Sequence, residues 1–487
     1  MTQKINTESH LEKALILINE PAPFNRIEYL TEELAKFDYR DPFVWTLHKG
    51  RYKEAIQELE LVLKEYPKSI DANEYMGNLL VTLGRYSEAL DYYQEAVSYG
   101  AETSIQLNIG ALYEYLGERH KCFDHYRWAA HNPNLSLLSE FLLAFPYSEL
   151  KIADNTLLEK IRNWINQYLD KEVPVKEEPS VQNPFEYIKR KITREGKCPL
   201  CGSMDSRLFY DDQTNHRKIR QCRECKLIYV SPQPNFSDIE SWYGKQYFES
   251  SFEGANRQLG LWKQTYENQE PIFHPTGRQF SLIFQWLESL GLKKVESKLS
   301  DKLRMLDIGC ATCGLMAEFI TRGWDAYGVE LSESAVHFDK EMGFNVIQGT
   351  VENSKFPDNY FDIITMTHVI EHLADPSATL KEVGRILRNK GKLVIRTPNC
   401  ESLPRLIAGK EWFGDHDHLF FFGNGTLEAI LKKCNFRIIG IKSYVGIDIE
   451  TYCVKWNQLR LNDLIRARIN QAELGDVILV YAEYQGD

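Results

Sequence analysis

Short apolar runs alternate with amphipathic stretches through residues 296–487, a pattern that predicts alternating strands and helices. The first run, Met305–Ile308, precedes a glycine-rich turn at 309–314 and an amphipathic stretch from Leu315 to Thr321. Such a run is typical of a buried parallel strand. Further strands are expected at Ala326–Val329, Asn345–Gln348, Phe361–Met366, Lys392–Arg396, Phe436–Val445 and Val477–Tyr484, and helices at Ser334–Glu341 and Pro376–Leu387. The pattern therefore predicts an α/β domain with seven strands.

Residues 1–170 have a helical pattern and contain an internal repeat. The segment Gly50–Ala55 recurs as Gly84–Ala89, and a weaker copy begins at Gly117. A period of about 34 residues, with glycine at the turn, is typical of tetratricopeptide repeats and predicts an all-α solenoid. Its groove either binds a partner protein or peptide, or the array serves as a rigid spacer or dimerisation arm, because a repeat shows architecture and not its ligand.

Two pairs of cysteines follow a charged, proline-containing stretch at 171–196 that we interpret as a linker. The pairs are Cys198 with Cys201, and Cys222 with Cys225. Two such turns can place four thiolates tetrahedrally around zinc, and a site with no open position would be structural. Short strands near Arg207–Tyr210 and Arg220 would make 197–235 a zinc ribbon. A redox dithiol and unrelated free cysteines are the alternatives.

Length and composition are those of a soluble protein of about three domains. The formal net charge of −11 argues against a nucleic-acid-binding surface. No run approaches the ~18 apolar residues of a membrane helix, and Ala14–Ile18 is too short for a signal peptide. Ten cysteines in so long a chain favour a cytoplasmic protein with a metal site over a disulfide framework.

Acidic residues lie on both sides of the glycine-rich turn. Asp307 is the second residue before Gly309, and Glu330 directly follows the second strand. Glycines allow close approach of a ligand at a helix N-terminus, and the second carboxylate can accept hydrogen bonds from ribose hydroxyls. A dinucleotide would favour glycine where Ala311 stands, and Asp307 would repel its pyrophosphate. The same carboxylate suits the ammonium of S-adenosylmethionine, so we favour that cofactor over a nucleotide of an oxidoreductase.

These motifs over residues 197–487 resemble the class I methyltransferases, in particular the small-molecule and sugar methyltransferases with an N-terminal cysteine module. The chain departs from the family at Ala311 and Cys313, where glycines are usual. The resemblance implies a Rossmann-like fold with a seven-stranded mixed sheet closed by an antiparallel hairpin. It also implies cofactor contacts from Asp307, Gly309, Cys310, Gly314, Glu330, Leu331, Thr350, Val351 and His368.

Residues 236–295 are rich in aromatic side chains, among them Trp242, Tyr247 and Trp262. We expect helices here that cover the cofactor entrance, although most of these side chains can equally serve plain packing between ribbon and catalytic domain.

The segment His368–His372 (HVIEH) opens the connection after the fourth strand. Its sequence is similar to an inverted zinc-protease motif and to the metal-binding segment of some methyltransferases. Its position at a strand end argues against the protease. We favour a structural role over a metal site, because no full ligand set is evident.

Histidines are the candidate catalytic bases. His418 lies in the connection 398–423 after the fifth strand, and His418–Phe420 is similar to a His-Leu-aromatic segment of the family. Its imidazole would titrate near neutral pH and could be oriented by flanking carboxylates. His368 is the rival, and His416 is a third candidate that can equally do no more than hydrogen-bond its loop.

We therefore expect transfer of a methyl group from S-adenosylmethionine to a small-molecule, sugar or carrier-linked acceptor, with oxygen favoured. The alternatives are a protein methyltransferase whose substrate is recruited by the repeats, and a repeat scaffold that binds cofactor without turnover. The chain can form an oligomer under each of these hypotheses.

Overall fold

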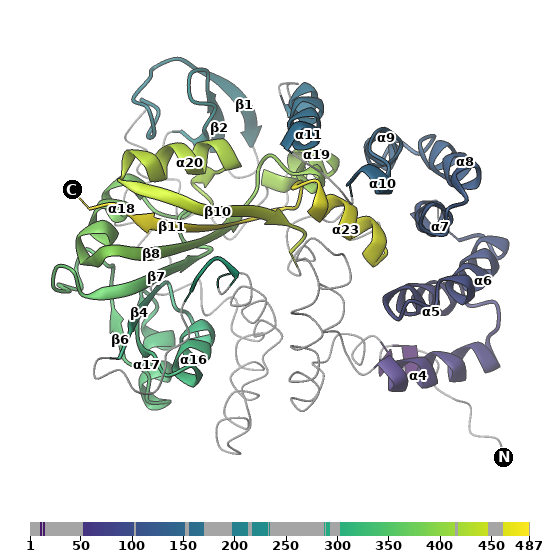
Figure 1. The fold of residues 1–487 in the computed structure, drawn as a ribbon, viewed down its shortest axis with the longest axis horizontal. Coiled ribbons are helices and arrows are strands. Elements are labelled where there is room, and N and C mark those ends of the chain that lie inside the picture. Colours follow the sequence, from purple (N-terminus) through teal and green to yellow (C-terminus); the bar gives the residue numbers. More distant parts are fainter. Residues whose placement is uncertain are drawn as a thin grey trace. The chain divides into compact units, whose positions relative to one another are not determined.

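The computed structural model describes residues 10–11, 13–14, 52–101, 104–150, 155–169, 197–212, 217–231, 233, 287, 289–292, 302–413, 417–446 and 461–486. The chain divides into two compact units, drawn in Figure 1. The first comprises residues 1–168, 406–408 and 444–475, and the second comprises 169–405, 409–443 and 476–487. The units are described separately below.

The first unit is helical, as the repeat predicts. Its helices are α4 (Tyr52–Glu65), α5 (Ile70–Thr82), α6 (Tyr86–Ser98), α7 (Ser104–Tyr115), α8 (Arg119–Ala129), α9 (Ser136–Ala144), α10 (Tyr147–Leu150), α11 (Asn155–Leu169) and α23 (Asp463–Gln471). The most extensive helix contacts join α5 to α6 and α7 to α8, which are the two helices of successive repeat units.

Glycines allow the paired helices of each repeat unit to approach closely. A Cβ added at Gly77 would lie 2.4 Å from Tyr93 Cε1, and one added at Gly110 would lie 2.5 Å from Tyr126 Cε1. Both tyrosines are fully buried. The glycine of the first helix and the tyrosine of the second therefore form the same contact in consecutive units.

The second unit contains a seven-stranded sheet in the order β10-β11-β8-β7-β4-β5-β6. The strands are β4 (Arg304–Ile308), β5 (Asp325–Glu330), β6 (Val346–Gln348), β7 (Phe361–Thr367), β8 (Leu387–Pro398), β10 (Phe436–Tyr444) and β11 (Val477–Tyr484). β4 pairs in parallel with β5 and β7, β5 with β6, and β7 with β8, whereas β11 runs antiparallel to β8. The predicted seven-stranded mixed sheet is confirmed.

The last two strands are neighbours, but a tight hairpin does not join them. Tyr444 ends β10 and Val477 begins β11, and the long connection between them includes α23. The prediction that these two strands form a closing hairpin was therefore wrong about the segment that joins them, which is long and contains a helix. β8 is also longer than the predicted Lys392–Arg396, because the chain enters it directly from the preceding helix.

Five helices follow the strands in the described part of this unit, and the first three are those that the pattern predicts. They are α16 (Gly314–Thr321), α17 (Glu333–Glu341), α18 (Pro376–Ile386), α19 (Leu403–Ala408) and α20 (Asn424–Lys433). α16 packs against β4 and β5, α17 against β5 and β6, and α18 against β8. Apolar side chains of the central strands are completely buried, so the core runs the length of the parallel sheet.

A second, smaller sheet has the order β1-β2-β3-β9. Its strands are β1 (Ser206–Asp212), β2 (Arg217–Cys222), β3 (Ile228–Val230) and β9 (Phe420–Phe421). The first three are the short strands expected for the cysteine module. The fourth comes from the connection after β8, so the module shares a sheet with the loop that carries His418.

Two predicted segments lie outside the described residues: the linker at 171–196 and nearly all of the aromatic-rich cover at 236–295. Among the helices that are described, none has the length and apolar character needed to cross a membrane.

Candidate functional site

Parallel pairing brings the ends of β4, β5 and β7 to one edge of the large sheet. Ile308 is in register with Val329 on one side and with Met366 on the other. Gly309, Glu330 and His368, which lie at these strand ends, are therefore neighbours. A Cβ at Gly309 would lie 2.5 Å from Val369 Cγ2, so the turn after β4 has room only for glycine at that point. The crevice at the carboxyl ends of the strands is where α/β sheets bind ligands.

The turn after β4 has left-handed backbone at three positions. Gly309 has a φ of 69°, Ala311 of 47° and Cys313 of 58°. Non-glycine residues pay a steric cost of about 1–2 kcal/mol in this region, so glycines would be less strained at the second and third positions. The chain keeps the conformation although it lacks those glycines, and Cys313 forms the N-cap of α16 in it.

Glu330 joins the glycine-rich turn to the second strand. Its Oε2 accepts a hydrogen bond from Ala311 N at 3.0 Å, and its Oε1 accepts one from Ser332 N at 2.9 Å. Burial raises the pKa of Glu330, and the backbone donors oppose that rise. The side chain remains partly accessible, so it lies where a ligand at this edge would meet it.

Asp307 is buried between the strands, with 4% of its surface exposed. Its Oδ1 accepts a hydrogen bond of 2.6 Å from the hydroxyl of Thr365 on the neighbouring β7. Burial raises the pKa of Asp307 to about 7, against the effect of the Thr365 hydroxyl. A cation placed at this carboxylate would favour its charged form.

The other residues expected to contact cofactor lie around the same edge. Cys310 is buried, and its Sγ would be 2.6 Å from a Cβ at Gly328 of β5. Leu331 follows β5 and is partly exposed. Thr350 and Val351 follow β6, where Gly349 N donates to the carbonyl of Glu330 at 2.9 Å. The structure thus brings the predicted cofactor residues from four strand ends together.

His368 follows β7 in left-handed backbone, with a φ of 54°. Histidine is one of the non-glycine residues enriched in this region. Its Nδ1 is 3.2 Å from Glu371 Oε1, and its ring is 21% exposed. The turn that contains Glu371 and His372 is not helical, which agrees with the argument against a protease motif.

Glu371 was predicted from sequence only as part of this motif, without the several segments that hydrogen-bond to it. It is 1% exposed and accepts hydrogen bonds from Thr397 Oγ1 at 2.9 Å and, through its carbonyl, from the backbone N–H groups of Leu419 and Phe420. Burial raises its pKa, but the hydrogen bond with His368 and the nearby histidines outweigh burial and hold the pKa at about 2. The sequence gives no signal for Thr397 or for this backbone pairing, because these partners lie far along the chain, in β8 and in the connection after it.

His418 lies deeper than a base at a pocket wall would. It is 5% exposed, its ring centroid is 4.6 Å from that of His372, and burial lowers its pKa to about 4. His416 lies outside the described residues.

Three groups in the described part of the chain bring potential metal ligands within 4.8 Å of one another. They are Cys198, Cys201, Cys222 and Cys225; Cys310, Cys313 and Asp339; and Glu371, His372 and His418. In the second group, burial raises the pKa of Cys313 and raises that of Asp339 to about 8. The third group shows that the HVIEH segment has a third potential ligand, His418, which was not evident from sequence because it comes from the connection after β8.

The structure brings the four cysteine sulfurs of the module within 4.8 Å of one another. Cys198 Sγ lies 3.4 Å from Cys225 Sγ, and Cys201 Sγ lies 3.5 Å from Cys222 Sγ. Four thiolates held tetrahedrally at about 2.3 Å from zinc would be about 3.8 Å apart. The donor set therefore fits zinc.

Comparison with known proteins agrees with the geometry of the sheet edge. A family model described as a methyltransferase domain matches residues 277–441, and one described as a tetratricopeptide repeat matches residues 46–107. The chain carries a class I S-adenosylmethionine-dependent methyltransferase domain and N-terminal tetratricopeptide repeats.

Curated relatives of this methyltransferase domain are distant. A ubiquinone biosynthesis O-methyltransferase of Parvibaculum lavamentivorans is 29% identical over 179 residues, which are 34% of this chain and 69% of that protein. An uncharacterized methyltransferase of Bacillus subtilis, YcgJ, is 32% identical over 120 residues, 23% of this chain and 47% of that protein. The chain thus spans between about half and two thirds of the length of such relatives.

Solved structures include a SAM-dependent methyltransferase from Archaeoglobus fulgidus, which is 22% identical. It covers 42% of this chain and 92% of its own, with a TM-score of 0.32.

Asp307 of the methyltransferase domain should give β4 a distinctive pH dependence in the ligand-free chain. An unfolded aspartate titrates near about 3.9, whereas the folded chain keeps the proton up to about pH 7. Between these values the folded state binds more protons, so the free energy of opening β4 should fall as pH rises, by at most about 1.4 kcal/mol per pH unit. This opening free energy is measured by hydrogen exchange of the β4 amides, after correction for the pH dependence of the intrinsic exchange rate.

Asp307→Asn is the matched variant, because its amide does not titrate. The difference in opening free energy between wild type and Asp307→Asn should change between pH 4 and 7 in the stated direction. A difference that is constant over that range would contradict the raised pKa.

Proposed function

We propose that the chain methylates a small-molecule, sugar or carrier-linked acceptor, with oxygen as the favoured acceptor atom. The observation that carries this proposal is the convergence of Asp307, Glu330 and His368 on the edge formed by β4, β5 and β7. The first two would hold the polar ends of the cofactor, and the third would face the acceptor. The printed names of several relatives, which describe them as O-methyltransferases, support oxygen as the acceptor atom.

In this proposal the chain's own residues bind and orient the reactants. S-adenosylmethionine, when bound, would supply a methyl group on its sulfonium. Asp307 would accept from the ammonium, directly or through water, and Glu330 would accept from the ribose hydroxyls. Gly309, Cys310 and Gly314 would line the turn, and Leu331, Thr350 and Val351 would surround the adenine side. Alignment of the acceptor with the methyl group would provide much of the rate.

Glu330→Gln should weaken binding of S-adenosylmethionine by about 1–3 kcal/mol, because a charge-assisted hydrogen bond becomes a neutral one. The single oxygen of glutamine can still accept from Ala311 N, which keeps that contact to the turn, while the hydrogen bond from Ser332 N is lost. Isothermal titration calorimetry measures the affinity.

Asp325→Asn provides the control, since Asp325 lies at the other end of β5, where its carboxylate is 3.5 Å from Lys302 Nζ. Equal affinities for Glu330→Gln and Asp325→Asn would remove Glu330 from the cofactor site.

We favour His368 over His418 as the base that takes the acceptor proton. The ring of His368 is partly exposed at the end of β7, and its Nδ1 faces Glu371, which would stabilise the imidazolium. This leaves Nε2, a buried atom in the structure, as the accepting nitrogen. His418 is buried, and its lowered pKa makes it a weak base near neutral pH. In this proposal His418 supports the ring of His372. His416 remains a candidate from sequence.

His368→Asn should lower product formation by about 10²–10⁴-fold, far more than it lowers affinity for the cofactor. Asparagine tolerates positive φ, so the backbone should be preserved. Cells that express each variant receive methionine labelled on its methyl group, and mass spectrometry follows the labelled small molecule that appears only with the active chain.

His337→Asn is the control, because His337 is exposed on α17 and pairs only weakly with Glu341. If product formation falls for His418→Asn and not for His368→Asn, the catalytic base is His418. Normal turnover of both would mean that the acceptor needs no base.

We also propose that the four cysteines hold a structural zinc. The short Sγ–Sγ distances support this, as do the two backbone turns, in which Gly202 N donates to Cys198 O and Lys226 N donates to Cys222 O. The site would stabilise β3, which pairs with β9, and Val230 N donates to Leu419 O at 2.9 Å. Leu419 N donates in turn to Glu371 O at 2.8 Å. The ribbon would thus help to position the turn that carries Glu371.

The purified chain should contain one zinc, and Cys201→Ser should lose it. Loss of metal should speed hydrogen exchange in β3 and β9 and leave affinity for S-adenosylmethionine mostly intact. Elemental analysis and exchange mass spectrometry measure the two effects.

Cys434→Ser, at the C-cap of α20, should retain the metal and the protection. A wild-type chain without zinc, or β9 unaffected by its loss, would contradict this account.

A further inference from the structure

The segment between the last two strands of the large sheet folds with the repeats. β10 ends at Tyr444 and β11 begins at Val477, but residues 444–475 belong to the compact unit that contains the repeats. Within that unit α23 packs against α5, α7 and α10. Because α5 and α7 are the first helices of two successive repeat units, α23 lies across a face shared by both. Repeat arrays use such continuous faces to bind ligands.

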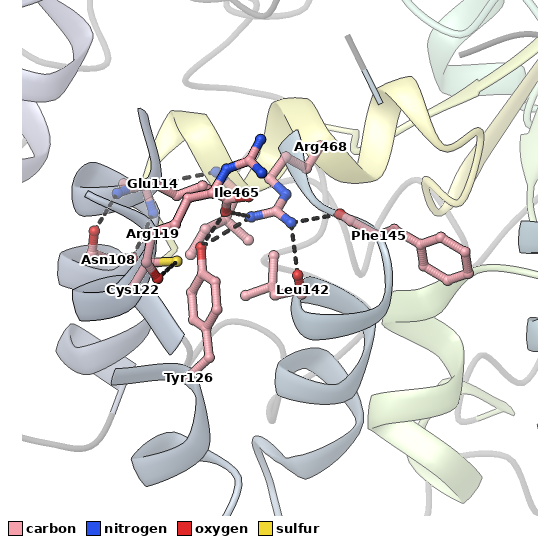
Figure 2. Close-up of polar contacts among 10 residues, drawn as sticks. Asn108, Glu114, Arg119, Cys122, Tyr126, Leu142, Phe145, Ile465 and Arg468 are labelled. Atoms are coloured by element: carbon pink, nitrogen blue, oxygen red, sulfur yellow. Dashed lines mark hydrogen bonds and ion pairs between the residues drawn. The ribbon is translucent and has the colours of Figure 1, made fainter. Parts of the chain in front are cut away.

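Arg468 is the main polar contact of α23. Its side chain is 2% exposed, and its guanidinium pairs with the carboxylate of Glu114. Figure 2 shows the same guanidinium directed at three further acceptors: Tyr126 Oη at 3.0 Å, Leu142 O at 2.9 Å and Phe145 O at 2.6 Å. A guanidinium can be buried at acceptable cost only when it is paired and hydrogen-bonded. The repeats provide these partners from α7, from α8 and from the end of α9.

The partners of Arg468 are themselves fixed by the repeat packing. Tyr126 packs on Gly110, and its hydroxyl donates to Glu114 Oε2 at 3.0 Å. The glycine and tyrosine that define the repeat unit thus also orient the carboxylate that receives the arginine. The side chains that recognise Arg468 are consequently a product of the repeat fold.

The N-terminus of α23 makes a second set of contacts. Asn462, the N-cap of α23, donates through its backbone N–H to Asn108 Oδ1 at 3.2 Å. Thr82 Oγ1 donates to Asp463 Oδ2 at 2.6 Å. Asn108 belongs to α7 and Thr82 to α5. Polar contacts at both ends of the helix therefore fix its register on the repeats, while Leu464, Ile465 and Ile469 are buried.

We infer that the ligand of the repeats is α23 of the same chain, so that the repeats act as an intramolecular clamp on the insertion between β10 and β11. Charge complementarity at Arg468 and the two contacts at the N-terminus make this helix the specific occupant. The segment is tethered at both ends, and a tether supplies an effective concentration of about millimolar. An outside protein could use this face only by displacing α23.

Arg468→Met in the full chain tests the clamp. It removes the positive charge that pairs with the buried Glu114 carboxylate, although the Tyr126 hydroxyl still donates to that carboxylate. Amides of α23 should therefore exchange roughly 100-fold faster or more, as should those of α7 and α8. Exchange in β4 and β5, and affinity for S-adenosylmethionine, should not change. The coupled response of α23 and the repeat helices is the diagnostic result.

Arg466→Met is the matched control, since Arg466 lies on the same helix and its Nε donates to the carbonyl of Leu461. It should leave exchange in α7 and α8 as in the wild type. If Arg468→Met does not fold, Thr82→Val offers a second variant, because it removes one hydrogen bond to Asp463. It should speed exchange at the start of α23 by roughly ten-fold.

Unchanged protection of α23 in Arg468→Met, or protection lost in α23 alone, would overturn the clamp. Light scattering tests the intramolecular part. The wild type should have the mass of one chain, 56.7 kDa. A wild-type dimer that Arg468→Met converts to monomer would place α23 on the repeats of a second copy and would overturn the intramolecular assignment.

Discussion

One buried carboxylate, that of Glu371, connects segments of the methyltransferase domain that are far apart in sequence. The side chain of Glu371 contacts His368 after β7 and Thr397 near the end of β8. The backbone carbonyl of Glu371 accepts hydrogen bonds from the N–H groups of Leu419 and Phe420, at the start of β9. β9 in turn pairs with the last strand of the cysteine module. A buried charge is tolerated only when its partners are held in place, so His368, the loop after β8 and the cysteine module are constrained together. The proposed acceptor side of the site depends on this network.

The proposed cofactor side depends on a different constraint, the narrow turn after β4. The elements of this turn could be predicted from sequence, because a strand, a glycine turn and an acidic residue at the end of the next strand follow each other within one short stretch. What the sequence did not reveal was the steric cost at Ala311 and Cys313, which adopt left-handed backbone that glycine would adopt with less strain. Glu330, which holds Ala311 N, helps to compensate that strain. A local motif is thus predictable, and its strain is not.

Contacts of long range were the part that sequence reasoning could not supply. The approach of His418 to Glu371 joins the connections after two different strands, and the pairing of Arg468 with Glu114 joins the last described helix to a helix of the repeats. The repeat predicted a helical array in residues 1–170, and periodicity located the last strands, but neither shows which helix covers which face. The insertion between β10 and β11 was consequently assigned to the methyltransferase domain, whereas α23 folds with the repeats. Buried charges such as Arg468 mark such contacts only after the fold is known.

The central claim is that the edge formed by β4, β5 and β7 binds S-adenosylmethionine and not a dinucleotide. Calorimetric titration of the purified wild-type chain with S-adenosylmethionine, S-adenosylhomocysteine and NAD⁺ tests it most directly. The buried Asp307 can ionise beside the ammonium that the first two ligands share, whereas it offers no favourable partner to a pyrophosphate. The account predicts saturable binding of one molecule of either sulfur compound per chain and no measurable binding of NAD⁺. Binding of NAD⁺ at this edge with no affinity for S-adenosylmethionine would contradict it.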